Sequence, residues 1–349
     1  MSLGSLFDAY GVVGTPSRGK MRAVEITQSH EIIITETEIP EVGANDILVK
    51  PVACGICGTD LLILKHGFPG TVYPVTPGHE FAGHVVSVGS EVRGIKEGDF
   101  VAVDPNVVCG RCKWCLSGRP NLCLERAPIG VRKPGAAADF VVAPAQNAFV
   151  VRETLGGGIA ALIEPLACVM HAIDSAQGVR DRNVLVLGGG TMGLLIAIVA
   201  QTSGAGRVTL ADPVSAKHAV ARRAGIQDVV EPDVLGSDFF DVVFEAAGAP
   251  SALNQALTLV EKTGTLVQVG AHDQHATARF VPFKIYEHEI KIVGSNSCAD
   301  KFSAAVEIMP DIQDRAAVLL GEPFSVWDFG SAVNSMIAGN AVKTQLRFP

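Results

Sequence analysis

Two short segments carry side chains that can ligate a metal ion. The first contains Cys57 and Thr59, and the second contains His79 and Glu80. A catalytic zinc ion takes three protein ligands of the Cys, His or carboxylate type and leaves a fourth position open to water or substrate. Nearby glycines let the backbone turn sharply enough for such ligands to converge. The sequence therefore predicts an open zinc site formed by Cys57, His79 and Glu80.

A second interpretation of the first segment stays open at this point. Cys54 and Cys57 form a C-x-x-C pair, which thioredoxin-like proteins use for redox chemistry. A single histidine such as His79 is also commonly a packed or surface residue. Motifs further along the chain favour the metal site.

Four cysteines follow at short spacings. Cys109, Cys112, Cys115 and Cys123 form the pattern C-x2-C-x2-C-x7-C. Four thiolates can surround a zinc ion tetrahedrally and leave no position open, which predicts a structural zinc lobe over residues 105–125. A ferredoxin-type iron–sulfur motif would have a three-residue last gap and a proline after the fourth cysteine, and this chain has neither. A pair of disulfide-linked hairpins is the remaining alternative.

A single carboxylate interrupts the apolar segment Ile159–Met170. Glu164 lies next to Pro165 in that segment, and burying a carboxylate among apolar residues is unfavourable unless it has a partner. Glu164 could cap a helix that begins at Pro165, where proline is common, or it could point toward the metal. The two roles are compatible.

A glycine-rich motif marks the middle of the chain. The apolar segment Val184–Leu187 predicts a buried parallel strand, and it leads into G-x-G-x-x-G and an apolar helix over Leu194–Thr202. A second strand, Arg207–Ala211, ends at an acidic residue. This context is that of a dinucleotide-binding fingerprint, in which the helix N-terminus faces the pyrophosphate and the acid holds the ribose hydroxyls. The residues predicted to bind the cofactor are Gly188, Gly190, Thr191, Met192, Gly193 and Asp212.

The elements around these motifs divide the chain into two kinds of region. Short strands between Pro and Gly residues dominate the first third, and both candidate ligand segments are expected in its loops. Strands alternate with helices in the middle, and the chain turns helical again after residue 298. Other expected elements are strands at Ala23–Ile26, Glu31–Thr35, Asp46–Val52, Phe81–Val88, Asp99–Val103, Phe240–Phe244, Leu266–Val269, Ile290–Val293 and Thr344–Phe348, and helices at Val214–Ala224 and Ser251–Glu261.

Length and composition limit the possible classes of protein. A chain of 349 residues exceeds what one hydrophobic core usually supports, so two domains are expected. The net charge of −8 disfavours nucleic acid and anionic membranes as partners. No secretory signal is visible, and the longest apolar run, Leu194–Ala200, is too short to span a bilayer. Clustered cysteines suit metal binding in a reducing compartment, so a cytoplasmic protein is predicted.

Taken together, the motifs resemble those of the zinc-dependent medium-chain alcohol and polyol dehydrogenases. The resemblance covers nearly everything from Met21 to the C-terminus, with the motifs in the family's order. Glu164 stands where the simple alcohol dehydrogenases carry a third cysteine ligand, so the sorbitol and threonine dehydrogenase branches are the most similar. The resemblance rests on Gly55–Asp60, Gly78–Glu80, the four-cysteine lobe, Glu164–Ala167 and the glycine motif.

The resemblance implies an α/β architecture with two domains. A GroES-like, β-rich catalytic domain would comprise residues 21–165 and 298–349, and residues 166–297 would form a Rossmann NAD-binding domain with a doubly wound parallel sheet. Residues 1–20 are expected to be an extension outside the fold. A homodimer or homotetramer acting on a small-molecule alcohol or polyol is implied as well.

The resemblance also assigns roles to single residues. Cys57 and His79 would bind the catalytic zinc with Glu80 as third ligand, while Glu164 would contact the zinc-bound water or exchange with Glu80. Asp60 would orient the histidine. Thr59 would take the proton of the substrate hydroxyl, which zinc makes more acidic.

Two departures separate this chain from sorbitol dehydrogenase itself. Leu62 stands where the sorbitol and threonine branches often carry a relay histidine, although His66 lies one helical turn further on. Asn296 and Ser297 stand where the sorbitol branch has an aromatic residue and an arginine that touches substrate.

The sequence therefore predicts an oxidoreductase that moves a hydride between a secondary alcohol, a polyol or sugar derivative, and NAD, with two zinc ions per chain. NAD is expected over NADP because Asp212 would repel a 2′-phosphate and residues 213–216 contain no arginine. The alternatives are a threonine-type amino-alcohol dehydrogenase and a non-catalytic NAD-binding sensor.

Overall fold

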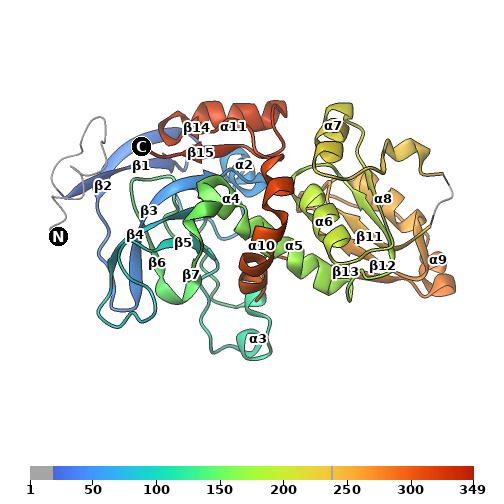
Figure 1. The fold of residues 1–349 in the computed structure, drawn as a ribbon, viewed down its shortest axis with the longest axis horizontal. Coiled ribbons are helices and arrows are strands. Elements are labelled where there is room, and N and C mark those ends of the chain that lie inside the picture. Colours follow the sequence, from blue (N-terminus) through green and yellow to red (C-terminus); the bar gives the residue numbers. More distant parts are fainter. Residues whose placement is uncertain (1–18, 237–238) are drawn as a thin grey trace. The chain divides into compact units, whose positions relative to one another are not determined.

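The computed structural model describes residues 19–236 and 239–349. The chain divides into two compact units, one formed by Met1–Glu164 with Leu320–Pro349 and the other by Pro165–Leu319. The expected N-terminal extension, residues 1–20, falls outside the described residues except for its last two positions, and the first strand already begins at Lys20. Figure 1 shows both units as ribbons.

The first unit is built on a seven-stranded sheet with the order β14-β15-β3-β4-β5-β7, in which β6 also pairs with β3. Phe81, Val101 and Phe329 belong to its buried core. The expected C-terminal strand is confirmed, because β15 pairs antiparallel with β3. The elements are β1 (Lys20–Ile26), β2 (Ile32–Glu38), β3 (Asp46–Gly55), α2 (Gly58–Lys65), β4 (Glu80–Val88), β5 (Phe100–Val103), α3 (Lys113–Leu116), β6 (Val141–Pro144), β7 (Ala148–Val150), α4 (Gly156–Ala161), β14 (Phe324–Ser325), α11 (Phe329–Ala338) and β15 (Gln345–Arg347).

The second unit is a six-stranded parallel sheet with helices packed on it, in the order β10-β9-β8-β11-β12-β13. Its strands run 3-2-1-4-5-6 within the unit, which is the order of the doubly wound dinucleotide-binding fold. Helix α6 packs against β8 and β9, and α8 packs against β11 and β12. The elements are α5 (Ile163–Ser175), β8 (Asn183–Leu187), α6 (Thr191–Thr202), β9 (Arg207–Ala211), α7 (Ser215–Arg223), β10 (Val229–Val230), β11 (Phe240–Glu245), α8 (Pro250–Thr258), β12 (Val260–Gln268), α9 (Pro282–His288), β13 (Lys291–Gly294) and α10 (Phe302–Ala317).

Two differences from the expected elements concern the second unit. The helix expected over Ser251–Glu261 ends at Thr258, because Val260 is buried and pairs with Phe240 in the sheet. The return to the first unit comes at Leu320 rather than at residue 298. Helix α10 stays with the second unit, where it contacts α6 and Arg315 Nε donates a hydrogen bond to the Ala224 carbonyl at 2.7 Å.

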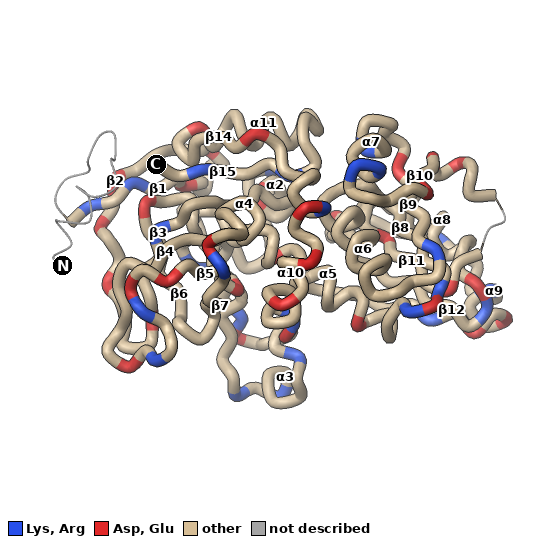
Figure 2. The backbone as a smooth tube through the Cα atoms, in the orientation of Figure 1, with Lys and Arg blue, Asp and Glu red and all other residues tan. Residues whose placement is uncertain are grey.

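Charged residues of both signs are scattered along the tube of each unit (Figure 2). Within the described residues, no single helix is both long and apolar enough to cross a membrane, and only Glu153–Ala161 together with Ile163–Ser175 reach that length and composition.

Candidate metal centres and cofactor site

The backbone of the first unit brings the three predicted zinc ligands together. Cys57 is the N-cap of α2, His79 immediately precedes β4, and Glu80 is the first residue of β4. Cys57 and His79 lie in loops, as expected, whereas Glu80 already belongs to a strand. A helix N-terminus stabilises a thiolate through its unpaired N–H groups and its dipole. The pairing of β3 with β4 places Gly55 opposite Glu80, and it thereby brings Glu80 close to the segment that carries Cys57.

The donor atoms of Cys57, His79 and Glu80 all lie within 4.8 Å of one another. His79 is 8% exposed and Glu80 only 2%. One thiol, one imidazole and one carboxylate form a donor set that zinc accepts. The residues therefore fit a zinc ion with one position left open.

Asp60 lies behind the histidine, as expected. Its Oδ2 accepts a hydrogen bond from the Cys57 N–H at 2.8 Å, and its Oδ1 is 3.7 Å from His79 Nδ1. Burial lowers the pKa of His79, but the charges of Asp60 and Cys57 outweigh this and hold that pKa well above its ordinary value. A small approach of Asp60 would let it accept the Nδ1 proton, which leaves Nε2 as the metal donor.

A buried lysine that the sequence analysis did not identify completes this site. Lys343 is 4% exposed, forms an ion pair with Glu80 Oε2, and donates a hydrogen bond to the Ile56 carbonyl at 2.9 Å. Burial lowers the pKa of Lys343, but the charges of Glu80, Cys57 and Glu164 and the hydrogen bond to Glu80 together outweigh this effect and raise that pKa overall, so the lysine stays charged. Gly55 makes room for the pair, because a Cβ there would lie 2.0 Å from Glu80 Oε2 and 2.7 Å from Lys343 Cε.

Glu164 is the second residue of α5 and is 8% exposed. Burial raises its pKa to about 7, with a further upward contribution from Glu80 that opposes the downward effect of His79. Glu164 therefore gains or loses a proton near neutral pH. The helix begins at Ile163, two residues before the expected start at Pro165, and so includes Glu164 in its first turn.

The other residues considered for proton transfer also lie on or beside α2. Thr59 Oγ1 is 3.8 Å from Cys57 Sγ. His66 is the exposed C-cap residue of the helix, and Leu62 is partly buried on it.

The C-x-x-C pair does not form a dithiol site. Cys54 is fully buried and its Sγ donates to the Gly55 carbonyl at 3.5 Å. Burial, followed by the charges of Asp60 and Glu80, raises the pKa of Cys54 well above its ordinary value. A thiol with a raised pKa is a poor nucleophile, so the redox interpretation of Cys54 and Cys57 has no structural support.

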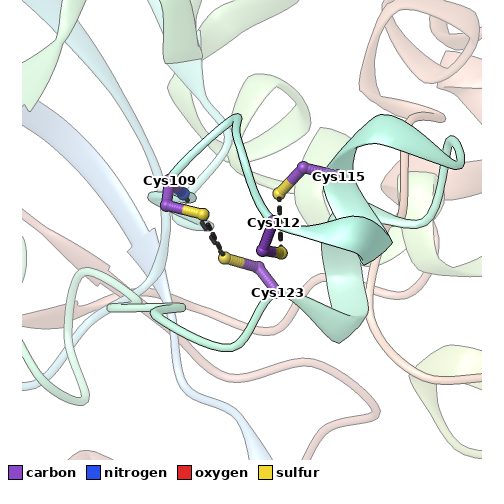
Figure 3. Close-up of side chains that lie close together, drawn as sticks. All are labelled: Cys109, Cys112, Cys115 and Cys123. Carbon is purple, nitrogen blue, oxygen red and sulfur yellow. Dashed lines mark hydrogen bonds between the residues drawn. The ribbon is translucent and has the colours of Figure 1, made fainter.

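The four lobe cysteines point toward one another (Figure 3). All four Sγ atoms lie within 4.8 Å of one another, with 3.5 Å between Cys109 and Cys123 and 3.6 Å between Cys112 and Cys115. All eight cysteines lie in the described parts of the chain, and none is in a disulfide. The set fits a closed tetrahedral zinc site.

Backbone N–H groups of the lobe favour the thiolate form of Cys112 and Cys123, whereas burial raises the pKa of Cys115 to about 12. Hydrogen bonds from the Cys115 and Leu124 N–H groups lower the pKa of Cys112 to about 6. Burial raises the pKa of Cys123, but N–H donors from Cys109 at 3.3 Å and Glu125 at 3.4 Å outweigh it, so that pKa is lowered overall. Thiolates are the form in which cysteine binds metal.

The glycine motif adopts the expected turn between β8 and α6. Gly188 has φ 108°, which favours glycine, and Gly190 is the N-cap of α6, with Thr191 and Met192 as its first two residues. A Cβ on Gly193 would lie 1.8 Å from the Gly188 carbonyl oxygen. The close packing that this position needs is the reason for glycine in the third place of such motifs.

Asp212 follows β9 and is 3% exposed. Its Oδ2 accepts hydrogen bonds from the Gly189 N–H at 2.7 Å and from Lys217 Nζ at 3.0 Å, and its Oδ1 accepts one from the Val214 N–H at 2.8 Å. Lys217 was missed in the sequence analysis, which stopped at residue 216. A lysine in the first turn after the acidic residue was the available signal.

A chain that combines a dinucleotide-binding fold with an open set of zinc-type donors is typical of oxidoreductases. Residues 43–153 match the model of the alcohol dehydrogenase GroES-like domain, and residues 191–311 match that of the zinc-binding dehydrogenase domain. The chain belongs to the zinc-dependent medium-chain alcohol and polyol dehydrogenase family. The predicted family and fold class are thereby confirmed.

Relatives with different substrates are similarly close. The chain is 34% identical over 300 residues to the D-altritol 5-dehydrogenase of Agrobacterium fabrum, covering 83% of this chain and 88% of that protein. It is 34% identical to the L-threonine 3-dehydrogenase of Escherichia coli, covering 93% of this chain and 99% of that protein. A solved structure of a Sinorhizobium meliloti protein bound to NADP matches with a TM-score of 0.90 at 34% identity, covering 94% of this chain and 99% of that one.

Proposed function

We propose that this chain is a zinc-dependent dehydrogenase that moves a hydride between NAD and a secondary carbinol of a polyol or sugar derivative. The observation that carries the proposal is the convergence of the half-buried Cys57 with the buried His79 and Glu80 within 4.8 Å. A sensor that binds NAD without turnover would not need an open three-ligand set of this kind. The family membership supports catalysis.

The chain's own residues would divide the work at this centre. Cys57, His79 and Glu80 would hold the ion, and Asp60 would keep His79 in the binding tautomer. A zinc ion in this position would make the substrate hydroxyl more acidic, which favours hydride loss from the adjoining carbon. Lys343 would limit the negative charge that Glu80 presents, because the two form an ion pair.

Two side chains are suited to handle protons. Thr59 would accept the proton of the substrate hydroxyl and pass it to the cofactor ribose or to water. Glu164, whose pKa is raised to about 7 by burial, would accept a hydrogen bond from a second hydroxyl of the substrate. Thr59→Ala should lower kcat at unchanged zinc content, whereas Thr59→Ser should retain most of the rate. Equal rates for Thr59→Ala and the wild type would exclude the relay role.

The presence of Glu164 favours a polyol over a simple alcohol. Ethanol has no second hydroxyl with which to use that carboxylate. Threonine remains the second candidate because its dehydrogenases are relatives at the same identity as the altritol enzyme. Linear and cyclic polyols, aldoses, threonine and ethanol should be compared by NADH formation at mildly alkaline pH. A higher kcat/KM for threonine or ethanol than for every polyol and sugar would refute the substrate class. A zinc-replete protein that binds NAD but oxidises none of them would support the sensor.

NAD is proposed as the cofactor because Asp212 is buried at the end of β9, where it would face a 2′-phosphate with like charge. Lys217 offsets part of this charge, so the discrimination should be smaller than Asp212 alone would give. kcat/KM with NAD should exceed kcat/KM with NADP. Asp212→Ser should decrease the ratio of these two values, and Lys217→Met should increase it. A higher kcat/KM with NADP in the wild type would overturn the assignment.

A second zinc ion, held by Cys109, Cys112, Cys115 and Cys123, is proposed to stabilise the lobe. Elemental analysis of protein purified without chelator should give two zinc equivalents per chain. Cys57→Ser should lose one equivalent and all activity. Finding iron instead would refute the structural zinc.

A homodimer or homotetramer in the cytoplasm completes the proposal. Strand β13 ends the parallel sheet, and an unpaired edge readily pairs with another copy. Phe283 is 61% exposed and Tyr286 80%, both on α9. Eight reduced cysteines suit a reducing compartment. Sedimentation equilibrium should show an oligomer, and Tyr286→Asp should weaken it if α9 forms the interface.

A further inference from the structure

Two cysteines that belong to neither predicted zinc site lie side by side in the second unit, and with Glu164 they form a third group of possible metal ligands, whose donor atoms lie within 4.8 Å of one another. Cys168 is in the second turn of α5, and Cys298 follows β13. Their Sγ atoms are 3.8 Å apart, with Cys168 donating to Cys298, although 130 positions separate them in the sequence. Cys298 is fully buried, whereas Cys168 is partly exposed.

One side of α5 fastens the segment that carries Cys298. His171 lies three positions after Cys168 and Asp174 three positions after His171, so each is a neighbour of the one before it on the helix surface. His171 Nδ1 is 3.0 Å from the Ser297 carbonyl oxygen, and Asp174 forms a 3.2 Å ion pair with Lys301. Ser297 and Lys301 lie on either side of Cys298 in the sequence, so these contacts hold the segment that carries Cys298 against α5.

The backbone around Cys298 is strained. Ser297 has φ 61° and Ala299 has φ 50°, so both neighbours of the cysteine are non-glycine residues in the left-handed region. Such conformations persist only where the surrounding structure imposes them, and they gather at functional sites.

We propose that Cys168 and Cys298 form a reversible disulfide, a thiol–disulfide modification site distinct from the zinc clusters. A disulfide needs the sulfur atoms at about 2.05 Å, so small side-chain rotations must close the observed gap. Cys54 in the C-x-x-C pair has no comparable partner, since its thiol donates to a backbone carbonyl.

The exposures of the two cysteines set the order of the chemistry. The oxidant is a low-molecular-weight disulfide such as glutathione disulfide. The Cys168 thiolate attacks one of its sulfur atoms and expels a thiolate, leaving a mixed disulfide on Cys168. The Cys298 thiolate then attacks the Cys168 sulfur and expels the second thiolate. The oxidant is reduced by two electrons to two thiols, which take up the two protons lost by the cysteines.

The test uses the full-length, zinc-loaded protein in glutathione redox buffers. Samples are quenched in acid, alkylated, digested and mapped by mass spectrometry, and zinc content is measured in parallel. The expected result is a cross-linked peptide pair containing Cys168 and Cys298, lost again on treatment with dithiothreitol, with the zinc content unchanged. Oxidation confined to the lobe cysteines or Cys57, accompanied by zinc loss, would overturn the proposal.

Single variants test the order of attack. Cys298→Ser should accumulate the mixed disulfide on Cys168, because the resolving thiol is gone. Cys168→Ser should leave Cys298 unmodified, because Cys298 is fully buried. Cys54→Ala serves as the matched control and should form the cross-link as the wild type does. Stable glutathionylation of Cys168 in the wild type without a cross-link to Cys298 would refute the proposed disulfide. This result comes from the wild-type protein and does not depend on how the variants fold.

Discussion

Replacing Lys343 by methionine tests how the protein balances charge at the catalytic metal centre. The side chains of Lys343 and Glu80 are 4% and 3% exposed, so the ion pair is shielded from solvent. Two unit charges in contact interact by about 4 kcal/mol at an effective dielectric constant of about 20. Removing one partner of a buried pair costs about 3–5 kcal/mol, because the other charge is left uncompensated. Lys343→Met should therefore destabilise the metal-free protein by about 4 kcal/mol.

The zinc-loaded protein should lose less, because the ion itself then compensates Glu80. If the loaded form loses about 1–2 kcal/mol, the thermodynamic cycle requires zinc to bind the variant more tightly by about 2–3 kcal/mol, which is about 30- to 150-fold. In the variant, Lys343 would also no longer compete with zinc for the Glu80 carboxylate.

Urea unfolding of metal-free and zinc-loaded protein, together with zinc-buffered dialysis and elemental analysis, would measure both quantities. Lys96→Met is the matched control, since Lys96 is exposed and such a change is usually worth less than about 0.5 kcal/mol. Equal destabilisation of both forms with unchanged zinc affinity would refute the reasoning.

Three further outcomes are expected. The pKa of Glu164 is raised from 4.5 to about 7, so the folded metal-free protein holds this proton more tightly than the unfolded chain does. Its free energy of unfolding should therefore fall by about 3 kcal/mol as the pH rises through that window. Urea titrations of Glu164→Gln should not show this fall. An identical pH profile for the variant would contradict this. Cys112→Ser should release one zinc equivalent and lower Tm while NAD binding, measured by fluorescence, persists; loss of both ions together would argue against two separate sites. Gly193→Ala should lower Tm because its Cβ would collide with the Gly188 carbonyl, whereas Gly190→Ala, with nothing within 4 Å, should not; equal Tm values for the two would contradict the packing argument.

Motifs with fixed spacing were the predictable part of the site. The four lobe cysteines lie within 15 positions of one another and therefore needed little of the fold to bring them together. The strand, glycine motif and helix at Val184–Thr202 were predicted because each element carries its own local pattern. Cys57 and His79 converge as expected because glycines and a strand pairing are near both.

Long-range packing was the part that could not be predicted. Lys343 carries no motif, and the pairing of β15 with β3 helps to bring it to Glu80. Helix α8 stops early because a tertiary partner, Phe240, draws Val260 into the sheet. Local propensity contains neither fact. Lys217 is different, because it lies five positions after Asp212 and was therefore predictable from the sequence.

The hydrogen bond from Lys343 to the Ile56 carbonyl joins positions 287 residues apart, and the whole of Pro165–Leu319 lies between them. Closing a loop of that size costs chain entropy, and contacts this distant in sequence slow folding. The first unit therefore cannot be completed until the second has been synthesised. Until then, β3 keeps an open edge where β15 will pair, a surface on which nascent chains can aggregate. A ribosome that stalls before Lys343 has already made Cys57, His79 and Glu80 but not the lysine that pairs with the Glu80 carboxylate. The predicted metal ligands are therefore synthesised early, and the residue that balances their charge is synthesised near the end.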